Sequence, residues 1–537
     1  MWQQNYTPIA DSVGASAATA ALPIVALLLL LGIFRKPAWM AALAGLASAS
    51  ILAVAVYGMP VPALIGAITY GAAIGIFPIG WVVFWAVVLY RITVETGNFE
   101  IVKDSVGSLT TDRRLQALLI AFAFGAFIEG AAGFGTPVAV AAAMLTGLGF
   151  KPFYAAGICL LANTAPVAFG SIGTPLLMLE TITRLPLLDL SANVGRICAP
   201  VSLIVPAYLV LVIGGLPALR GVFPAAALCG ISFAGVQFLV SNYIGPQLTD
   251  ILSSLAAMAS LVLLFKFWKP KDAAQYSVEV VLRKHTTQEV LRAWMPYGLL
   301  VIFVLLLGLD AIKAALGWAT MSFPWPGLHN VIERIPPAVR AAGPYPALFS
   351  FNFLTASGTA CMVASFLSAL FLGMGFGKFL QTVGATARQL ALSMVTIMSV
   401  LALSFLMNYA GATATLGLAF AATGALFPFF SAMLGWLGVF LTGSDTSANA
   451  LFGNLQVVTA ERLGFNPLLM AASNSSGGVM GKMISLQSIA VAAAATGMAA
   501  EDEAKLFRFT FFHSVLLAVV LGLIVVLYAY VFPTWVR

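Results

Sequence analysis

Residues 128–175 read IEGAAGFGTPVAVAAAMLTGLGFKPFYAAGICLLANTAPVAFGSIGTP. The stretch is apolar enough for a membrane, yet glycine, proline and polar residues interrupt it near Gly130 and again near Asn163. Backbone that leaves helical geometry inside a bilayer exposes polar groups, which is tolerated only where protein or water satisfies them. The stretch therefore predicts a re-entrant hairpin followed by a broken membrane helix.

The composition of the whole chain agrees with a membrane location. Of its 537 residues, 61% are hydrophobic and 8% are charged, and the mean hydropathy is +1.00. A soluble domain carries about 25% charged residues. This composition excludes a soluble enzyme, a secreted disulfide scaffold and a nucleic-acid binder, despite the net charge of +7. No cofactor and no metal site is expected, because the three histidines show no metal-ligand spacing.

The apolar runs predict an all-α polytopic membrane protein with about 12 full crossings plus two re-entrant hairpins. Nothing basic precedes the first run, and Arg35 and Lys36 follow it, so the N-terminus is expected outside. This topology places 18 Lys and Arg residues in inside loops and 7 outside. Both termini are then predicted to face the outside of the membrane.

The chain divides into two halves, residues 1–268 and 294–537, joined by a charged cytoplasmic linker at 269–293. Each half is expected to hold scaffold helices, an amphipathic arm, a hairpin and a broken helix. These lie at 91–113, 114–149 and 152–183 in the first half, and at 375–389, 427–462 and 466–497 in the second.

The two halves echo each other at matched motifs. Gly130 corresponds to Gly443 at a spacing of about 313 residues, the two LGFxP motifs at about 315, and Asn163 to Asn474 at about 311. This register places seven crossings between the hairpins, and an odd number inverts the second half. A competing register, at an offset near 280, pairs Glu129 with Asn408 and Asn163 with the Gly443 loop.

Broken helices at matched positions of two halves point to a transporter site near the membrane midplane. Half-helix N-termini carry partial positive charge and free N–H donors, which suit an anion. Polar and glycine residues at the interruptions are the candidate substrate-binding residues: Gly133, Gly135, Thr136, Asn163, Thr164, Ser444, Thr446, Asn474, Ser475 and Lys482.

Three charges lie within the interrupted membrane segments, where ionisable groups suggest function. Lys482 suits a carboxylate substrate, because a buried ammonium without a partner tends to lose its proton. A permanent ion pair with Asp445 or Glu129 is the alternative, and both hold if the substrate competes for the lysine. Glu129 and Asp445 are candidate carriers of a coupled proton, or alternatively hold Na⁺ together with backbone carbonyls.

At these segments the chain resembles the lactate permease family of bacterial 2-hydroxy-acid transporters. The resemblance lies in residues 128–145, 161–175, 403–417, 441–456 and 473–493. It implies proton-driven uptake of lactate, with glycolate as a common co-substrate, across the bacterial inner membrane. It further implies a branch of the wider ion-transporter superfamily, whose members move a transport domain by an elevator motion on a scaffold that is often a homodimer. Contacts with membrane lipids are also expected. Leu486 stands where the family has Pro after the Met-Ile-Ser triplet.

The sequence and this resemblance together predict a secondary active transporter that imports a small 2-hydroxy monocarboxylate with a proton. The carboxylate would meet Lys482, and the 2-hydroxyl would bond Asn163, Thr164, Ser444, Asn474 or Ser475. A Na⁺-coupled organic anion transporter on the same architecture, and an anion channel, are the rival interpretations.

Overall fold

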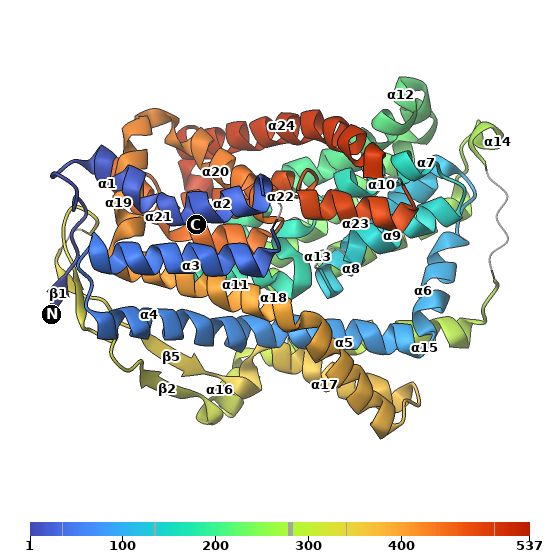
Figure 1. The fold of residues 1–537 in the computed structure, drawn as a ribbon. Coiled ribbons are helices and arrows are strands. Elements are labelled where there is room, and N and C mark those ends of the chain that lie inside the picture. Colours follow the sequence, from blue (N-terminus) through green and yellow to red (C-terminus); the bar gives the residue numbers. More distant parts are fainter. Residues whose placement is uncertain (35, 134–135, 278–282, 340, 499, 537) are drawn as a thin grey trace.

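A computed structural model describes residues 1–34, 36–133, 136–277, 283–339, 341–498 and 500–536. Long helices run side by side through the molecule (Figure 1). Within these ranges, 11 helices are long and apolar enough to cross a membrane, or 12 if one strongly bent pair counts as a single span. The chain is therefore a multi-pass helical membrane protein.

The N-terminal helices are α1 (Val13–Ala20), α2 (Leu22–Gly32), α3 (Ala38–Ala55), α4 (Val61–Ile74), η1 (Gly75–Gly80) and α5 (Trp81–Glu95). Of these, α3, α4, η1 and α5 pack against the later helix α18, α1 packs against α19, and α2 packs against α3 and α20. A short amphipathic helix, α6 (Asn98–Gly107), follows within the predicted first arm. Asn98 begins it after Gly97, whose left-handed backbone ends the preceding long helix.

The interrupted stretch of the first half forms a helical segment long enough to cross a membrane, Arg113–Ala131, then a shorter apolar helix, Thr136–Gly147, and then a bent helix. Its elements are α7 (Arg113–Gln116), η2 (Ala117–Phe124), α8 (Gly125–Ala131), α9 (Thr136–Gly147), α10 (Pro152–Ala162), η3 (Val167–Phe169) and α11 (Gly170–Thr183). The path turns by 64° between α10 and α11. Pro152 suits the first turn of α10, since its missing N–H would have no helical partner there.

The middle of the chain holds further long helices and an irregular region. The helices are α12 (Leu187–Tyr243), η4 (Pro246–Leu248), α13 (Thr249–Phe267), α14 (Ala273–Tyr276), α15 (Thr287–Gly308), α16 (Asp310–Leu316), η5 (Gly317–Ala319), η6 (Phe353–Thr355) and α17 (Ser357–Phe371). Non-helical backbone at Gly214 and Gly215, and again at Val222, interrupts α12.

Short strands correct the all-α expectation in the loops. They are β1 (Trp2–Gln3), β2 (Met321–Pro324), β3 (Ile332–Arg334), β4 (Gly343–Pro344) and β5 (Leu348–Phe351). β1 and β4 pair with β3, and β2 pairs with β5. The loop carries several prolines, which break helices but are tolerated at strand ends and edges.

The last part of the chain contains the second interrupted stretch. Its helices are α18 (Phe376–Ala410), α19 (Ala412–Phe420), η7 (Ala421–Leu426), α20 (Phe427–Thr442), α21 (Asp445–Leu463), α22 (Pro467–Lys482), α23 (Leu486–Thr496), α24 (Ala500–Tyr530) and η8 (Pro533–Trp535). The predicted second arm, 375–389, is the first part of the continuous helix α18. No glycine or proline lies between Gly384 and Gly411 to interrupt that helix.

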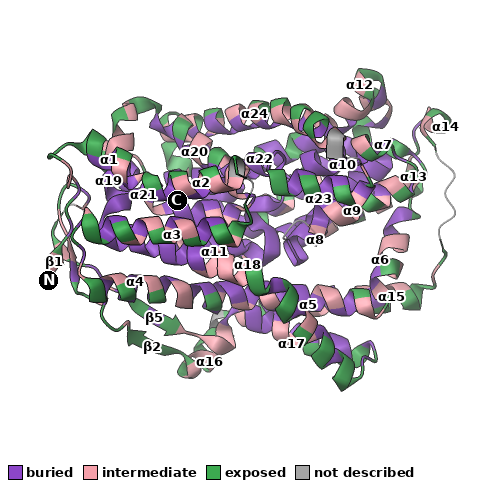
Figure 2. Cartoon of the chain, in the orientation of Figure 1, coloured by how far each residue is buried: buried purple, intermediate pink, exposed green. Residues whose placement is uncertain are grey.

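Burial separates an interior from an apolar exterior. Every residue of α8 is buried, as is nearly all of α22, whereas large apolar side chains are exposed on outer helices such as α3 and α24 (Figure 2). Phe512 is 74% exposed and Ile51 is 70% exposed. A water-soluble protein rarely exposes large contiguous apolar areas, so these faces suit lipid contact.

Segments predicted to share one side of the membrane contact one another. Gln4 donates to the carbonyls of Asn408 and Tyr409, and Arg184 Nη2 donates to Pro346 O. At the opposite end of the long helices, His285 bonds Asp104 at 2.8 Å (Figure 1). These contacts join segments that are predicted to share a side of the membrane.

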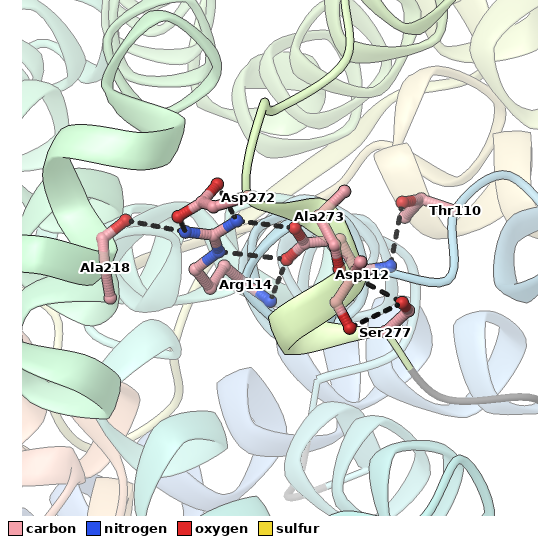
Figure 3. A network of polar contacts seen from close by, with 8 residues as sticks. Thr110, Asp112, Arg114, Ala218, Asp272, Ala273 and Ser277 are labelled. Carbon is pink, nitrogen blue, oxygen red and sulfur yellow. Dashed lines mark hydrogen bonds and ion pairs between the residues drawn. The ribbon is translucent and has the colours of Figure 1, made fainter.

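A buried arginine fastens the base of α7 to the linker. Arg114 is fully buried and donates to both oxygens of Asp112 and of Asp272 at 2.7–3.1 Å (Figure 3). Its guanidinium carbon lies 3.7 Å from the ring centre of Tyr276, and Nη1 also reaches Ala218 O. Hydrogen bonds from Arg114 hold the pKa of Asp272 below its usual value.

Candidate functional site

The four interruptions of the membrane helices meet at one cavity of about 140 Å³. We call the turn after α8 the first tip and residues 443–444 the second tip. The first break is 163–173, between α10 and the regular part of α11, and the second break is 483–485, between α22 and α23. Each of these four regions, or the residue next to it, contributes to the cavity wall: Gly133, Gly443, Ser444, Val167, Gly170, Ser171, Lys482 and Gln487.

The first tip and the first break are packed closely together. Gly133 has φ of +60°, and a Cβ added there would lie 2.9 Å from the Cβ of Ser171. Ser171 Oγ donates to Ala132 O at 3.3 Å. Only glycine combines the left-handed conformation with this close approach at low energy.

The first break holds its backbone in an uncommon conformation. Ser171, Ile172 and Gly173 have φ of +47°, +59° and +72°. Left-handed conformations of non-glycine residues cost on the order of 1–3 kcal/mol each and gather at functional sites. The break therefore ends one half-helix and begins another, with Ser171 on the cavity wall.

Glu129 lies in the last turn of α8, just before the first tip. It is 5% exposed, and its Oε2 accepts a 2.9 Å hydrogen bond from Asn163 Nδ2 in the first break. A Cβ added at Gly170 would lie 2.6 Å from Glu129 Oε1. The carboxyl group therefore fills the space between α8 and α11 and reaches the cavity.

The second tip has the same glycine conformation. Gly443 has φ of +71°, and an added Cβ would lie 2.7 Å from Gln487 Oε1 beyond the second break. Ser444 begins α21, and its Oγ accepts the N–H of Ser447 at 3.3 Å. A serine N-cap of this kind satisfies one of the free donors of a helix start. Thr446 and Ser447 continue the polar wall of the cavity.

Asp445 is held by a buried chain of hydrogen bonds. Its Oδ2 accepts from Ser475 Oγ at 2.6 Å and from Asn449 Nδ2 at 3.5 Å. Asn449 Nδ2 also donates to Pro175 O at 3.0 Å, while Asn474 Nδ2 donates to Asn449 Oδ1 at 2.9 Å. The chain joins α21 and α22 of the second half to α11 of the first.

Lys482 brings the one positive side chain to the cavity wall among the residues that the structure describes. It is 8% exposed, ends α22, and its Nζ donates to Gly443 O at 2.6 Å. Within the described ranges, no carboxylate oxygen lies within 4.0 Å of that nitrogen. Glu129 and Asp445 are both within its electrostatic reach. The permanent ion pair considered from the sequence is therefore absent from this conformation.

The structure places the predicted substrate-binding and proton-coupling residues at different distances from the cavity. The cavity wall holds Glu129, Gly133, Ser444, Asp445, Thr446 and Lys482. Asn163, Asn474 and Ser475 lie behind it, in the hydrogen bonds that hold the tips. Thr164 Oγ1 donates to Leu161 O in its own turn, and Thr136 donates its N–H to Gly133 O. Gly135 lies outside the described residues.

Sequence reasoning missed several polar residues at or near the site. Ser171, Thr442, Ser447 and Gln487 line the cavity, together with Ser393 and Thr396 of α18. Ser171 and Gln487 stand inside the interrupted motifs, so their position was a usable signal. Asp250, in the first turn of α13, is buried close to Glu129. The sequence offered a signal for it, because an acidic residue is unusual within an apolar crossing.

A larger groove of about 470 Å³ lies elsewhere, between α6 and α9. Apolar side chains such as Phe99, Val140 and Met144 line much of it. None of the four interruptions contributes to its wall among the described residues. The smaller cavity is therefore the candidate site, since it gathers the buried charges and the broken backbone.

The chain closely matches known permeases along its whole length. The family described as L-lactate permease matches residues 16–532. The L-lactate permease of Bacillus subtilis is 44% identical over 99% of this chain and 99% of its own. The Escherichia coli L-lactate permease is 43% identical over 100% of this chain, and the Escherichia coli glycolate permease GlcA is 43% identical over 99% of it. These two comparisons cover 99% and 98% of the relatives.

Among solved structures, Neisseria gonorrhoeae MtrF aligns with 88% of this chain and 84% of its own, at a TM-score of 0.46 and 12% identity. That likeness is too weak to carry an argument, whereas the sequence relatives are decisive. The chain belongs to the L-lactate permease family.

Proposed function

We propose that the protein is a secondary active transporter that carries a small 2-hydroxy monocarboxylate, lactate or glycolate, together with a proton. Membership of a permease family indicates a transporter rather than an enzyme. Relatives named as lactate and glycolate permeases, each about 43% identical, support this substrate class. The observation that carries the proposal is the cavity at which both tips, both breaks and Lys482 meet.

Lys482 is the proposed partner of the substrate carboxylate. Its present acceptor is the neutral carbonyl of Gly443. A carboxylate accepts a stronger, charge-assisted hydrogen bond than a carbonyl, so an entering anion would replace Gly443 O. Freed from Lys482, the second tip could then change its position.

The substrate hydroxyl would bond the polar wall around this lysine. Ser444 and Thr446 at the second tip and Ser171 at the first break reach the cavity. Asn163, Asn474 and Ser475 act one layer behind, by holding Glu129 and Asp445. The proposed recognition therefore combines one charge with several short hydroxyl side chains.

Glu129 and Asp445 are the proposed proton carriers. Both line the cavity, both are within the electrostatic reach of Lys482, and burial favours the neutral form of a carboxyl. Substrate binding to Lys482 would withdraw the positive charge that stabilises their ionised forms. One proton moving with one lactate anion would make transport electrically neutral.

The proposed architecture is an inverted repeat with two re-entrant hairpins and an elevator motion. Matching left-handed glycines at both tips support the register that pairs the first half with the Gly443 loop. Gly411, the tip in the competing register, lies instead against Gln4 and Tyr6 of the N-terminal segment. α23 packs on α9 and α10, and α21 packs on α11, which supports one interlocked moving unit.

Purified protein in proteoliposomes tests the coupling ion and the substrate together. An inward proton gradient without Na⁺ should drive accumulation of labelled L-lactate, and an excess of glycolate should inhibit it. A Na⁺ gradient at equal pH should give only equilibration. Accumulation that requires Na⁺ would replace the proton proposal with the Na⁺-coupled alternative, and flux far above carrier rates would indicate a channel.

A further inference from the structure

A third carboxyl group lies beside the candidate site and has no assigned role. Asp250, in the first turn of α13, is 1% exposed. Neither of its carboxyl oxygens has a hydrogen-bond donor within the described part of the chain. By contrast, Glu129 accepts from Asn163, and Asp445 accepts from Ser475.

Asp250 stands directly behind the helix that carries Glu129. α13 packs along α8, and a Cβ added at Gly130 would lie 2.8 Å from the Cβ of Asp250. Glu129 is the residue before that glycine and interacts electrostatically with Asp250. Because Gly130 has no side chain, α8 and α13, which carry the two carboxyl groups, can approach each other closely.

Among the described residues, no lysine, arginine or histidine forms an ion pair with Asp250. Glu129 faces it from α8, and Cys198 of α12 is also within electrostatic reach. α11 carries Glu180, about two turns beyond Gly173, which meets Pro246 of η4. Neither η2 nor η4 has a titratable side chain. Apart from the positive N-terminal end of α13 itself, nothing near Asp250 in the described ranges would stabilise its ionised form.

The buried region around the cavity therefore holds more acidic groups than basic ones. Glu129, Asp250 and Asp445 are buried, and Lys482 is the one buried cation that interacts with any of them among the described residues. If all three carboxyls were ionised, the region would hold two uncompensated negative charges. Buried unpaired charge is strongly unfavourable, so protons must neutralise part of the set.

We propose that Asp250 and Glu129 form a coupled carboxyl pair that holds the transported proton, with Asp250 as its protonated member in the substrate-free protein. Two adjacent carboxyls resist simultaneous ionisation, and the proton they share belongs to the pair. The inference rests on proton symport as the function. It adds that Glu129 alone does not hold the proton and that α13 takes part in coupling.

The variant Asp250→Asn keeps the size of the side chain but cannot release a proton. It should retain lactate counterflow at equal pH, because the cavity wall is intact. Its proton-driven accumulation should fall by about tenfold or more, as expected for loss of a coupling free energy. Ser253→Ala, one turn further along the same buried helix, is the matched control and should leave both rates unchanged.

Three results decide the inference. Normal proton-driven accumulation by Asp250→Asn overturns it, and so does equal loss of counterflow and accumulation in a folded variant, which would mark a structural residue. If Asp250→Asn does not fold, Asp250→Glu should keep driven accumulation with a displaced pH dependence, and an unchanged pH dependence overturns the inference. Wild-type accumulation without a proton gradient would instead reject the proposed function itself.

Discussion

At the scale of single residues, the site depends on a few buried polar side chains in an apolar chain. Glu129, Asp445 and Lys482 could be found from the sequence because a charge inside an apolar run is visible without any structure. Asp250 carries the same signal, but its link to the site does not follow from the sequence, because it depends on contact with Gly130, about 120 residues earlier in the chain. Side-chain contacts between distant helices leave no periodic pattern to read.

Replacing Lys482 with alanine should weaken lactate binding by tenfold or more. A hydrogen bond to a charged group contributes about 1.5–3 kcal/mol, which corresponds to roughly 10- to 150-fold in affinity. Lactate titration of purified protein by calorimetry measures this directly. Lys505→Ala, at an exposed lysine, is the control and should bind normally. Wild-type affinity in Lys482→Ala would remove the carboxylate assignment.

Replacing Asp445 with asparagine should separate binding from coupling. Ser475 and Asn449 can still bond the amide oxygen, so the second tip should keep its shape. Counterflow should survive within a few-fold, and accumulation under a proton gradient should fall less than in Asp250→Asn, because the transported proton is held by Asp250 and Glu129. A larger fall than in Asp250→Asn would assign the transported proton to Asp445. Unchanged accumulation would assign the transported proton to the Glu129 side of the cavity.

At the scale of elements, close backbone contact joins the two helices that carry the second tip and the second break. A Cβ at Gly435 would overlap Asn474 O, and Cβ atoms at Gly477 and Gly481 would overlap the carbonyls of Ala432 and Trp436. Small residues let membrane helices approach this closely. The second break is followed by Leu486 and not by a proline, and Ser485 caps the start of α23 by accepting the N–H of Ser488.

Gly477→Ala should destabilise the protein and reduce uptake together. The added methyl must displace the backbone of α20, and overpacking of this kind costs about 1–3 kcal/mol. Thermal unfolding in detergent measures the loss as a lower Tm. Gly384→Ala, in a helix with open space at that position, should not lower the Tm. Equal Tm values would show that α20 and α22 are not tightly packed.

The hydrogen bonds between Arg114 and Asp272 should make the stability of the fold depend on pH in the acidic range. Because hydrogen bonds from Arg114 lower the pKa of Asp272, this pair stabilises the fold above the ordinary value of 3.8 and loses that effect as pH falls through the lowered value. Asp272→Asn should therefore reduce the Tm at pH 7 and match wild type in strong acid. Asp502→Asn, in an exposed pair, is the control and should show no such difference.

At the scale of the whole molecule, the sequence predicted a polytopic helical protein because length and hydropathy determine which segments can cross. It also placed the four interruptions, because glycine, proline and polar residues stand out within apolar runs, and helices end at each of them in the structure. It did not predict the short strands of the outer loop, which depend on pairing between residues 2–3 and 332–333. Nor could it place the four interruptions at one cavity, which requires the packing of α21 on α11.

The grouping of segments at two ends predicts opposite accessibility. A single cysteine introduced as Asn5→Cys should react with a membrane-impermeant maleimide in intact cells. Gln275→Cys, in the exposed part of the linker, should react only after permeabilisation. The four native cysteines are buried and should give a low background. Reaction of Gln275→Cys in intact cells would reverse the predicted orientation.

The central claim is that one cavity, formed by both tips and both breaks, binds the carboxylate at Lys482. The most direct measurement is a structure of the purified protein with L-lactate at saturating concentration. We expect lactate between the two tips, with its carboxylate bonded to Lys482 Nζ in place of Gly443 O. Lactate bound in the groove between α6 and α9, with Lys482 still bonded to Gly443, would contradict the claim.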